Sequence, residues 1–535
     1  MCGIIYYLNS NYNDINTEEF KNCIVKLEAR GPDNSQFLEI NEYNKMGFTR
    51  LSINDLSDKG NQPLIDNDKY YLICNGEIYN HKLLKEEYNF ICNSNSDCEV
   101  IIKMYEKFGL EKIDEMIRKL DGVFAFVLYD KILNITICAR DPFGVRPLFI
   151  GYTKNLELIL SSEIKSIANI TKHITPFPPG EYMIINQNKN NNVIHKSYHN
   201  YKFDFINDDY NTIKNNIKSL LISAVEKRLM SDRPIGCLLS GGLDSSLISA
   251  IVAKHFPPYT LNTFSIGMKN STDLYYANIA AKHIKSKHHN IELTNQDFLD
   301  AIEKTIYITE SYDITTIRAS VGNYLIGKYI KNNCNVKVVY NGDGSEEIFG
   351  SYKWFSFIND ENDFFFENLK LLREIYYFDV LRSDRSISDN GLEPRTPFLD
   401  KTLVDYVMRI PPKYKMFGGD IIEKNIIREA FDDTDLLPKE VLWRKKEAFS
   451  DGVSGIEDSW HKIIQRELNQ KITDDEFNTK KLLYKHNPPI SKESLHYREI
   501  FEKYFPNKST VIPHMWLPNA KYVNILDPSA RNLPK

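Results

Sequence analysis

The sequence has no excess of charge of either sign. Lysine and arginine total 67, aspartate and glutamate total 72, and the net charge is −5 over 535 residues. Because nucleic-acid binding depends on concentrated positive charge, this balance argues against nucleic acid as a partner. Hydrophobic residues make up 42% and charged residues 26% of the chain. These values are close to the globular average, so they exclude a mainly disordered, collagen-like or coiled-coil protein.

Long apolar runs are also missing. The longest ones, such as residues 123–129, have the length of a strand, whereas a membrane helix needs about 20 apolar residues. Near the start of the chain, Asn9, Asn11 and Asp14 interrupt any apolar core of a secretion signal. We therefore expect no membrane partner and a cytoplasmic location.

The cysteines and histidines lack the spacings of structural metal sites. The eight cysteines include no CxxC pair, and the twelve histidines include no HExxH. These absences argue against a zinc knuckle and a zinc protease site, and eight scattered cysteines are too sparse for a disulfide scaffold. We expect the cysteines to be reduced and mostly buried.

The chain divides into two halves of different pattern. Short apolar runs with a few helical stretches, at residues 18–28 and 100–108, make the first 200 residues β-rich. A polar stretch at residues 204–212 predicts a linker, which gives domains at 2–208 and 209–535. After the linker, the order helix, strand, glycine loop, helix predicts an α/β domain with a parallel sheet, and the chain is mostly helical from residue 350 onward.

Cys2 is the first candidate catalytic residue. Removal of Met1 would leave a thiol and a free α-amine on one residue, and an amine with a pKa of about 7.7 to 8.0 can accept the thiol proton. A cysteine at position 2 is by itself most simply a coincidence, but several motifs follow it through the same half. They are Arg30-Gly31-Pro32-Asp33, Arg50-Leu51-Ser52-Ile53, Gln62-Pro63, Asn75-Gly76-Glu77, Ser96-Asp97 and Arg140-Asp141-Pro142-Phe143-Gly144.

With these motifs, residues 2–180 resemble the N-terminal-nucleophile glutamine amidotransferases, which hydrolyse glutamine to glutamate and ammonia. The resemblance implies an αββα sandwich. It also implies that Cys2 attacks the glutamine amide and that Asn75 and the backbone amide of Gly76 form the oxyanion hole, although Asn75-Gly76 alone would indicate a type I′ turn. One position departs from the family, because Ala29 stands where a histidine is common.

The same resemblance assigns a glutamine-binding pocket. Arg50 would hold the α-carboxylate of glutamine with its planar guanidinium, Asp97 would accept the α-ammonium, and Glu77 would line the pocket. Taken separately, Arg50 and Asp97 would most often be surface charges or a structural pair.

A glycine-rich loop, Leu238-Leu239-Ser240-Gly241-Gly242-Leu243-Asp244-Ser245-Ser246, follows a predicted strand and precedes a predicted helix. Such a loop binds anions, because its N–H and hydroxyl groups converge at a helix N-terminus. Asp244 among phosphate-binding groups favours a Mg²⁺ ligand, although a helix N-cap is the simpler structural reading. The loop lacks the Gly-Lys-Ser/Thr ending of a Walker motif. A second acidic loop at residues 341–347 follows another predicted strand of the same sheet.

The first loop resembles that of the ATP pyrophosphatases (adenine nucleotide α-hydrolase-like), which cleave ATP between its α and β phosphates. Together with the amidotransferase half, the chain resembles the glutamine-dependent asparagine synthetases from Cys2 to about Phe505. Supporting runs are residues 312–320, 395–400, 443–447 and 497–501. The family implies an enzyme, a carbon-nitrogen ligase in which aspartate attacks the α-phosphate of ATP, giving β-aspartyl-AMP and pyrophosphate. Ammonia then displaces AMP.

The resemblance assigns roles in this second half. Leu238 and Ile266 would flank adenosine, and Asn341 and Gly342 would contact the nucleotide. The pyrophosphate cradle would be Ser240, Gly241, Gly242, Asp244, Ser245 and Ser246. Lys446 would offset phosphate charge, Thr315 and Arg318 would serve the intermediate and the substrate carboxylate, and Asp244 and Glu346 would bind Mg²⁺.

Two acids depart from the family pattern. Relatives usually have glutamate where Asp343 stands and aspartate where Glu346 stands, so the two side-chain lengths are exchanged, and Asp343 is counted here among the catalytic candidates. A carboxylate displaced by about 1 Å can cost about 100-fold in rate. We therefore hypothesise a synthetase site that is slow or selective for its metal.

The leading hypothesis is an ATP-dependent, glutamine-hydrolysing asparagine synthetase. One alternative is an amidotransferase that acts on another carboxylate or closes a β-lactam ring, but ring closure needs no ammonia and Cys2 is present. A second alternative is a catalytically weak regulatory homologue, which the exchange at Asp343 and Glu346 keeps open. The expected partners are glutamine, aspartate and ATP, and a homodimer is one option that the sequence leaves undecided.

Overall fold

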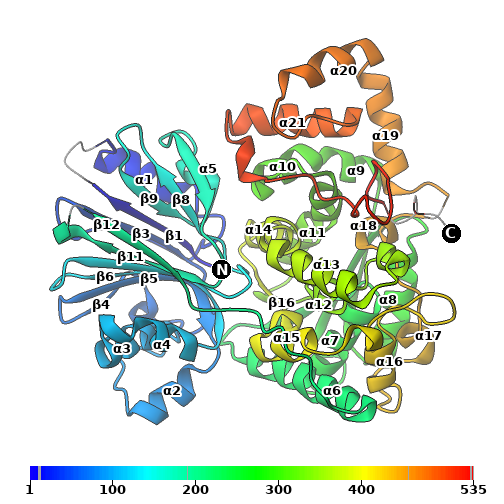
Figure 1. Cartoon of the computed structure of the whole chain (residues 1–535), viewed down its shortest axis with the longest axis horizontal. Coiled ribbons are helices and arrows are strands. Elements are labelled where there is room, and N and C mark those ends of the chain that lie inside the picture. Colours follow the sequence, from blue (N-terminus) through cyan, green and yellow to red (C-terminus); the bar gives the residue numbers. More distant parts are fainter. Residues whose placement is uncertain (10–13, 190, 456, 530–532, 534–535) are drawn as a thin grey trace. The chain divides into compact units, whose positions relative to one another are not determined.

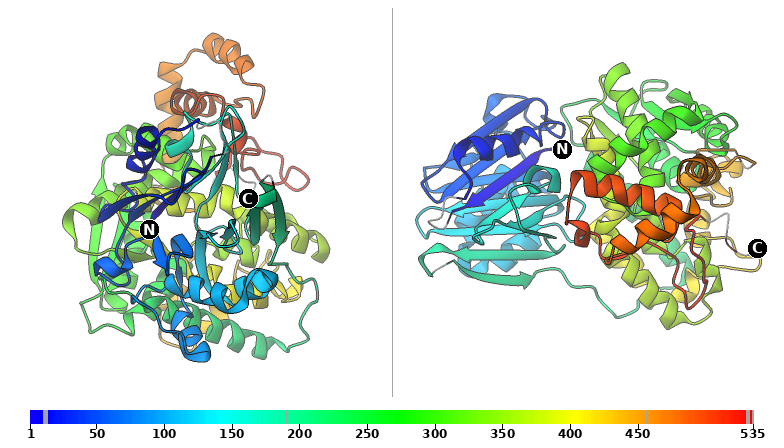
Figure 2. Two further views of the ribbon diagram at one scale, coloured as in Figure 1. Left: turned by 90° about the vertical axis from the view of Figure 1, so that its left-hand side faces the viewer. Right: turned by 90° about the horizontal axis from the view of Figure 1, so that it is seen from above.

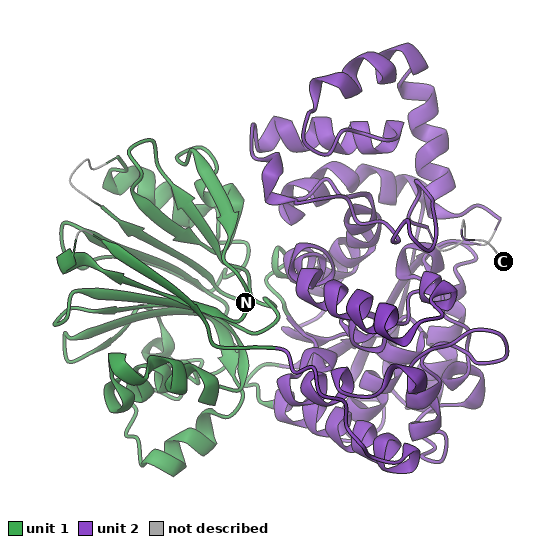
Figure 3. Cartoon of the chain, viewed as in Figure 1, with its two compact units in different colours: residues 1–200, 230–233, 388–393 green, residues 201–229, 234–387, 394–535 purple. Residues whose placement is uncertain are grey.

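The structure is a computed structural model that describes residues 1–9, 14–189, 191–455, 457–529 and 533. The chain forms two compact units (Figure 3). Unit 1 comprises Met1–Asn200 together with two short later segments, Met230–Arg233 and Ser388–Glu393. Unit 2 comprises Tyr201–Leu229, Pro234–Ile387 and Pro394–Lys535. Within the described residues, no helix has the length and apolar character needed to cross a bilayer.

Unit 1 contains two six-stranded antiparallel sheets (Figure 1). The first has the order β10-β8-β9-β1-β3-β2. Its strands are β1 (Gly3–Leu8), β2 (Asn34–Glu39), β3 (Asn44–Arg50), β8 (Phe149–Tyr152), β9 (Leu158–Ser161) and β10 (His173–Pro176). The second has the order β12-β11-β7-β6-β5-β4. Its strands are β4 (Leu64–Asp66), β5 (Tyr70–Ile78), β6 (Gly122–Asp130), β7 (Ile135–Arg140), β11 (Glu181–Asn186) and β12 (Asn192–Ser197).

Helices cover the outer faces of these two sheets. The apolar core between the sheets joins residues of β1 and β3, such as Ile4 and Phe48, to residues of β5 and β6, such as Ile73 and Val127. Helices α1 (Thr17–Val25) and α5 (Ile164–Ile167) pack on the first sheet. Helices α2 (His81–Tyr88), α3 (Glu99–Phe108) and α4 (Ile113–Lys119) lie beside the second, where residues of α3 and α4 share a buried cluster with β5 and β6. The order helix, sheet, sheet, helix confirms the predicted αββα sandwich.

Unit 2 is built on a five-stranded sheet of order β15-β14-β13-β16-β17. Its strands are β13 (Ile235–Leu238), β14 (Asn262–Met268), β15 (Lys287–Leu293), β16 (Val338–Tyr340) and β17 (Glu393–Arg395). β13 runs parallel to both β14 and β16, and β14 runs parallel to β15, so the predicted parallel sheet is confirmed. Because the carboxyl ends of parallel strands share one sheet edge, the loops after β13 and β16 are brought together there.

The rest of unit 2 is mostly helical, as predicted (Figure 2). The helices before residue 345 are α6 (Tyr210–Glu226), α7 (Leu243–Ala253), α8 (Thr272–His283), α9 (Asn295–Asp300), α10 (Ile302–Thr309) and α11 (Ile314–Asn333). The later ones are α12 (Ser345–Phe349), α13 (Glu361–Glu374), α14 (Asp379–Ser388), α15 (Lys401–Met408), α16 (Asn425–Phe431), α17 (Lys439–Leu442), α18 (Phe449–Gly452), α19 (Trp460–Lys471), α20 (Asp474–Lys480) and α21 (Lys492–Tyr504).

Lys415 is a buried cation that connects three of these helices. Its Nζ donates to Asn368 Oδ1 of α13 at 3.1 Å, to Val407 O of α15 at 3.2 Å and to Ile348 O of α12 at 3.5 Å. These acceptors are neutral, so they compensate only part of the cost of burying an ammonium group. Burial lowers the pKa of Lys415 to about 7 from an ordinary value of 10.5.

This depressed pKa predicts a pH-dependent stability. Between about pH 7 and pH 10 the unfolded chain keeps a proton on Lys415 that the folded chain has lost, so folding becomes more favourable as the pH rises. Relative to Lys415→Met, the wild type should gain about 1.4 kcal/mol of unfolding free energy per pH unit across this range and show a constant difference below pH 6. Denaturant titrations of both proteins measure this difference, and a pH-independent difference would contradict the assignment.

Two candidate active sites

Cys2 lies at the beginning of β1, against the second sheet. Its backbone N donates to Asn75 Oδ1 of β5 at 3.1 Å, and its Sγ lies 3.9 Å from Leu51 O. Arg30 Nε donates to Cys2 O at 2.9 Å, which fixes the same residue from the other side. Burial raises the pKa of the Cys2 thiol, so the resting group is protonated and needs a base to become a nucleophile.

Asn75 carries a hydrogen-bond donor that nothing else uses. Its Oδ1 accepts from the Cys2 backbone N–H, while its Nδ2 is buried and has no hydrogen-bond partner among the described residues. Unpaired buried donors are rare because they cost free energy, so they often mark a place where a ligand binds. The next residue must be glycine, because a Cβ at Gly76 would clash with Val123 O. The residue that binds the Cys2 backbone therefore also carries a buried amide donor with no partner among the described residues.

Arg50 is buried and held by the loop that follows it. Its Nη1 donates to Ser57 O and to Asn61 Oδ1, both at 2.8 Å, and its Nη2 donates to the carbonyls of Asn54, at 3.4 Å, and Asp55. These acceptors fix the orientation of the guanidinium and use all four N–H groups of its terminal nitrogens, so binding of a substrate carboxylate by Arg50 stays a prediction.

Glu77 and Asp97 form an acidic pair that one amide connects. Asn54 Nδ2 donates to Asp97 Oδ1 at 3.3 Å and also to Glu77 Oε2. Burial raises the pKa of Asp97, although the backbone N–H of Ile78 donates to its Oδ2 at 2.7 Å and partly offsets this effect. Asn54 was not predicted from the sequence, because nothing near it marks a lone asparagine in a loop as functional.

The second site is built on the loop between β13 and α7. Gly241 has a φ of 73°, and a Cβ there would clash with Ala277 N, so glycine is required. The hydroxyls of Ser240 and Ser245 are 2.9 Å apart, and Gly242 N donates to Ser240 Oγ at 3.3 Å. Hydroxyls, a backbone amide and a helix N-terminus therefore converge at one point, which is an arrangement that binds anions.

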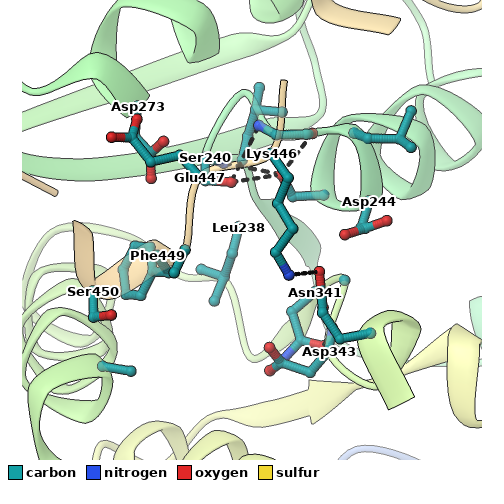
Figure 4. Close-up of a pocket in the computed structure, with 18 of the residues that line it drawn as sticks. Leu238, Ser240, Asp244, Asp273, Asn341, Asp343, Lys446, Glu447, Phe449 and Ser450 are labelled. Atoms are coloured by element: carbon teal, nitrogen blue, oxygen red, sulfur yellow. Dashed lines mark hydrogen bonds and ion pairs between the residues drawn. The ribbon is translucent and has the colours of Figure 1, made fainter. Parts of the chain in front are cut away.

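A cavity of about 210 Å³ opens beside this loop (Figure 4). It brings together most of the residues that the sequence predicted for this half. Those that line it are Leu238, Ser240, Gly242, Asp244, Ser245, Ile266, Thr315, Asn341, Gly342, Asp343, Glu346 and Lys446. Figure 4 shows the long side chain of Lys446 extending toward the loop that carries Asn341 and Asp343.

Two lysines neutralise the acids of this cavity. Lys424 Nζ lies 2.6 Å from Asp244 Oδ2 and 2.8 Å from Glu346 Oε1, and Lys446 Nζ donates to the same oxygen of Glu346. Burial alone would raise the pKa of Glu346, but Lys424 and Lys446 hold the pKa of this carboxyl well below its usual range. Lys424 was not predicted. Its φ of 57° is unusual for a non-glycine residue, and backbone strain of this kind is common at functional sites.

Asp343 faces a different partner. Its Oδ1 accepts from Arg382 Nη2 at 3.0 Å, and its Oδ2 accepts from Asn341 Nδ2 at 2.7 Å. Burial raises the pKa of Asp343, and the charge of Arg382 offsets only part of that rise. Asp343 and Glu346, the two acids whose side-chain lengths are exchanged relative to the family, therefore have different charged neighbours. Glu346 faces Lys424 and Lys446, and Asp343 faces Arg382.

Three predicted residues do not line the cavity: Gly241, Ser246 and Arg318. The first two belong to the loop itself, but Arg318 is directed elsewhere. Its guanidinium pairs with both carboxylate oxygens of Glu493, at 2.6 and 2.9 Å, and with those of Asp527, at 2.8 and 3.0 Å. Thr315, one helical turn earlier on α11, does line the cavity.

The carboxylates of Asp244 and Glu346 fit a Mg²⁺ ion as a pair. Both point at one Nζ atom within hydrogen-bond distance, so they converge on a single point. Oxygen ligands from one or two carboxylates, completed by substrate phosphates, are what Mg²⁺ usually takes in nucleotide sites. The described residues contain no group of three or more His, Cys, Asp or Glu side chains arranged to hold a metal without such a substrate.

Comparison with known families accounts for both halves. Residues 1–202 match the family model described as glutamine amidotransferase domain, and residues 216–374 and 364–520 match the model described as asparagine synthase. The chain is 40% identical over 539 residues to glutamine-hydrolyzing asparagine synthetases of Rattus norvegicus and Homo sapiens, covering 95% of both chains in each case. A probable glutamine-hydrolyzing asparagine synthetase of Acanthamoeba polyphaga mimivirus is 40% identical over 556 residues, with 100% of both chains covered.

Two solved structures have partial similarity to the chain, both at low sequence identity. Glutamine phosphoribosylpyrophosphate amidotransferase from B. subtilis has 19% identity and a TM-score of 0.32, with 49% of this chain and 65% of that chain covered. NMN synthetase from Francisella tularensis has 13% identity and a TM-score of 0.26, with 58% of this chain and 100% of that chain covered.

Proposed function

The chain belongs to the family of glutamine-hydrolysing asparagine synthetases, and we propose that it makes asparagine from aspartate with nitrogen released from glutamine. Glutamine hydrolysis gives glutamate and ammonia. ATP activates the β-carboxylate of aspartate as β-aspartyl-AMP with release of pyrophosphate, and ammonia displaces AMP to form asparagine. The observation that carries this proposal is that one chain holds both the Cys2–Asn75 pair and the cavity of acids and lysines beside the glycine-rich loop.

For glutamine hydrolysis, we propose that Cys2 becomes the first residue after removal of Met1. Its α-amine, held by Asn75 Oδ1, takes the thiol proton, and the thiolate attacks the side-chain amide carbon of glutamine. The oxyanion binds Asn75 Nδ2 and the backbone N–H of Gly76, and one such donor is typically worth about 100- to 1,000-fold in rate. Ammonia leaves as the amine returns its proton, and water hydrolyses the thioester to glutamate.

For glutamine recognition, we propose that Arg50 binds the α-carboxylate and that Asp97 and Glu77 bind the α-ammonium. The acceptors around Arg50 are uncharged, so they orient its guanidinium without neutralising it. The Asn54 amide already places a donor between the two carboxylates, which is the interaction that an ammonium group would make more strongly.

For aspartate activation, we propose that Leu238 and Ile266 flank adenosine, Asn341 and Gly342 contact the nucleotide, and the loop at residues 240–246 holds the pyrophosphate. Asp244 and Glu346 would hold Mg²⁺, which supplies positive charge against the phosphates. Lys446 faces the same phosphates as a point cation. We propose that Thr315 contacts aspartate or its adenylate and that Asp343 acts nearby. Recognition of the substrate carboxylate by Arg318 stays a prediction, since Glu493 and Asp527 already pair with this residue.

We also propose domain bounds, a location and partners for this enzyme. We place the glutaminase domain at residues 2–208 and the synthetase domain at 209–535. We propose a cytoplasmic enzyme, active as a monomer or homodimer, with small-molecule substrates and no nucleic-acid or membrane partner. The balanced charge and the lack of long apolar runs support this assignment.

A product assay tests the overall reaction. With glutamine, ATP, Mg²⁺ and aspartate, we expect asparagine, glutamate, AMP and pyrophosphate in equal amounts, measured by chromatography and mass spectrometry. Formation of ADP in place of AMP would contradict adenylation. Glutamine hydrolysis without nucleotide cleavage would instead favour the regulatory homologue, and cleavage that depends on a different acid would favour another amidotransferase.

Because glutamine hydrolysis and asparagine synthesis are proposed to take place at separate sites, Cys2→Ala should affect only the first. This variant should lose glutamine-dependent synthesis, by about 1,000-fold or more, because the nucleophile is gone. Synthesis with free ammonium chloride should stay within about twofold of wild type, because the nucleotide cavity lies wholly in unit 2. Equal loss with both nitrogen donors, in a variant that melts at the wild-type temperature, would contradict the proposed separation.

The exchanged acids predict a second pair of variants. Glu346→Asp shortens the side chain that reaches both lysines, and Asp343→Glu lengthens the one that faces Arg382. We expect at least one of them to change the rate of ammonia-dependent synthesis, or its ratio between Mg²⁺ and Mn²⁺, by about 10- to 100-fold. Asp300→Glu on the surface of α9 is the matched control. If neither variant changes the rate or the metal preference, the exchange of aspartate and glutamate at positions 343 and 346 does not affect catalysis, and the prediction is wrong.

A further inference from the structure

The segment Met230–Arg233 belongs to unit 1 although it lies far along the chain from the rest of that unit. It follows a short helical turn at Lys227–Leu229 and ends two residues before β13. The motifs that identify the glutaminase half all lie before residue 150, and no role follows from them for these four residues. Their contacts are with the loop at residues 52–55, which comes directly after Leu51 and Arg50.

Asp232 and Arg233 bind the backbone of this loop at several points. Asp232 Oδ2 accepts from Asp55 N at 2.8 Å, and Asp232 N donates to Ile53 O at 2.9 Å. Arg233 Nε donates to Ser52 O at 2.9 Å. The two residues therefore use a carboxylate, an amide and a guanidinium on consecutive peptide groups of one short loop.

A carboxylate of unit 1 reinforces the arginine contact. Asp33 Oδ2 accepts from Ser52 N at 2.8 Å and lies 3.7 Å from Arg233 Nη2. The N–H and the carbonyl of Ser52 are thus both bound, one by Asp33 and the other by Arg233. Asp55 has a φ of 59°, so the loop also contains a residue in the left-handed region that needs outside support.

The loop held in this way carries the groups that aim the glutamine-binding side chains. The carbonyls of Asn54 and Asp55 accept from Arg50, which orients the guanidinium. The side chain of Asn54 connects Glu77 to Asp97. A shift of this loop would therefore move the carboxylate-binding and the ammonium-binding ends of the pocket together.

We propose that Asp232 and Arg233 are positioning residues for glutamine, holding residues 52–55 so that Arg50 and Asn54 keep their orientations. This inference rests on the proposed glutaminase function and adds two residues from the downstream half of the chain to it. They act through the loop and do not contact the substrate. The groups that they hold are the ones proposed to bind the α-carboxylate and the α-ammonium of glutamine, so loss of either contact affects glutamine binding more than the thiol chemistry.

The test compares glutaminase kinetics of the full-length wild type with Asp232→Ala and Arg233→Ala. We expect the KM for glutamine to rise about 10-fold or more in each variant, with kcat for hydrolysis within about threefold. Asp232→Asn keeps a side-chain oxygen that accepts from Asp55 N, so its KM should stay within about threefold of wild type. Synthesis with free ammonium chloride should be unchanged in all three.

Asp458→Ala and Arg466→Ala are the matched controls, since these two residues form an exposed ion pair with each other in unit 2. They should leave the KM for glutamine unchanged. If Asp232→Ala does not fold, as judged by its melting temperature, Arg233→Ala decides the question.

An unchanged KM in the alanine variants, or an equal loss of ammonia-dependent synthesis, would overturn the inference. So would a KM in Asp232→Asn as high as that in Asp232→Ala. If the wild-type enzyme does not hydrolyse glutamine, the proposed glutaminase function is wrong. That result differs from a failure of the positioning role, in which the wild type is active and the variants keep its KM.

Discussion

A single hydrogen bond, from the Cys2 backbone N to Asn75 Oδ1, fixes the geometry on which glutamine hydrolysis depends. It connects the start of β1 in the first sheet to β5 in the second, so the nucleophile is located by the same packing that stabilises the sandwich. It also divides the amide of Asn75 between two tasks. The oxygen accepts from the Cys2 backbone, and the nitrogen is buried and has no partner among the described residues, which suits the oxyanion-hole role proposed for it.

In the synthetase site, the main electrostatic feature is the pairing of two lysines with two carboxylates. Lys424 pairs with both Asp244 and Glu346, Lys446 pairs with Glu346, and the two lysines hold the pKa of Glu346 well below its usual range. Lys424, between the two acids, occupies the position where a divalent ion would serve both.

The sequence predicted what is local and missed what is brought together by folding. The helical stretches predicted at residues 18–28 and 100–108 appear as α1 and α3, because periodicity depends on neighbours along the chain. Lys424 and Asn54 reach their sites from loops without any recognisable motif. Arg318 is the opposite case, because the sequence predicted it, yet its side chain pairs with Glu493 and Asp527 while its neighbours on α11 line the cavity. Side-chain direction on a helix is set by tertiary packing, which no motif reports.

The central claim is that Cys2 is the first residue of the mature chain, with its thiol as the nucleophile and its α-amine as the base. Intact-mass and peptide mass spectrometry of the purified protein test this claim most directly, because they identify the first residue and any group attached to it. The account predicts a chain that begins at Cys2 with an unmodified α-amine. A retained Met1, or an acylated amine on Cys2, in a preparation that still hydrolyses glutamine would contradict it.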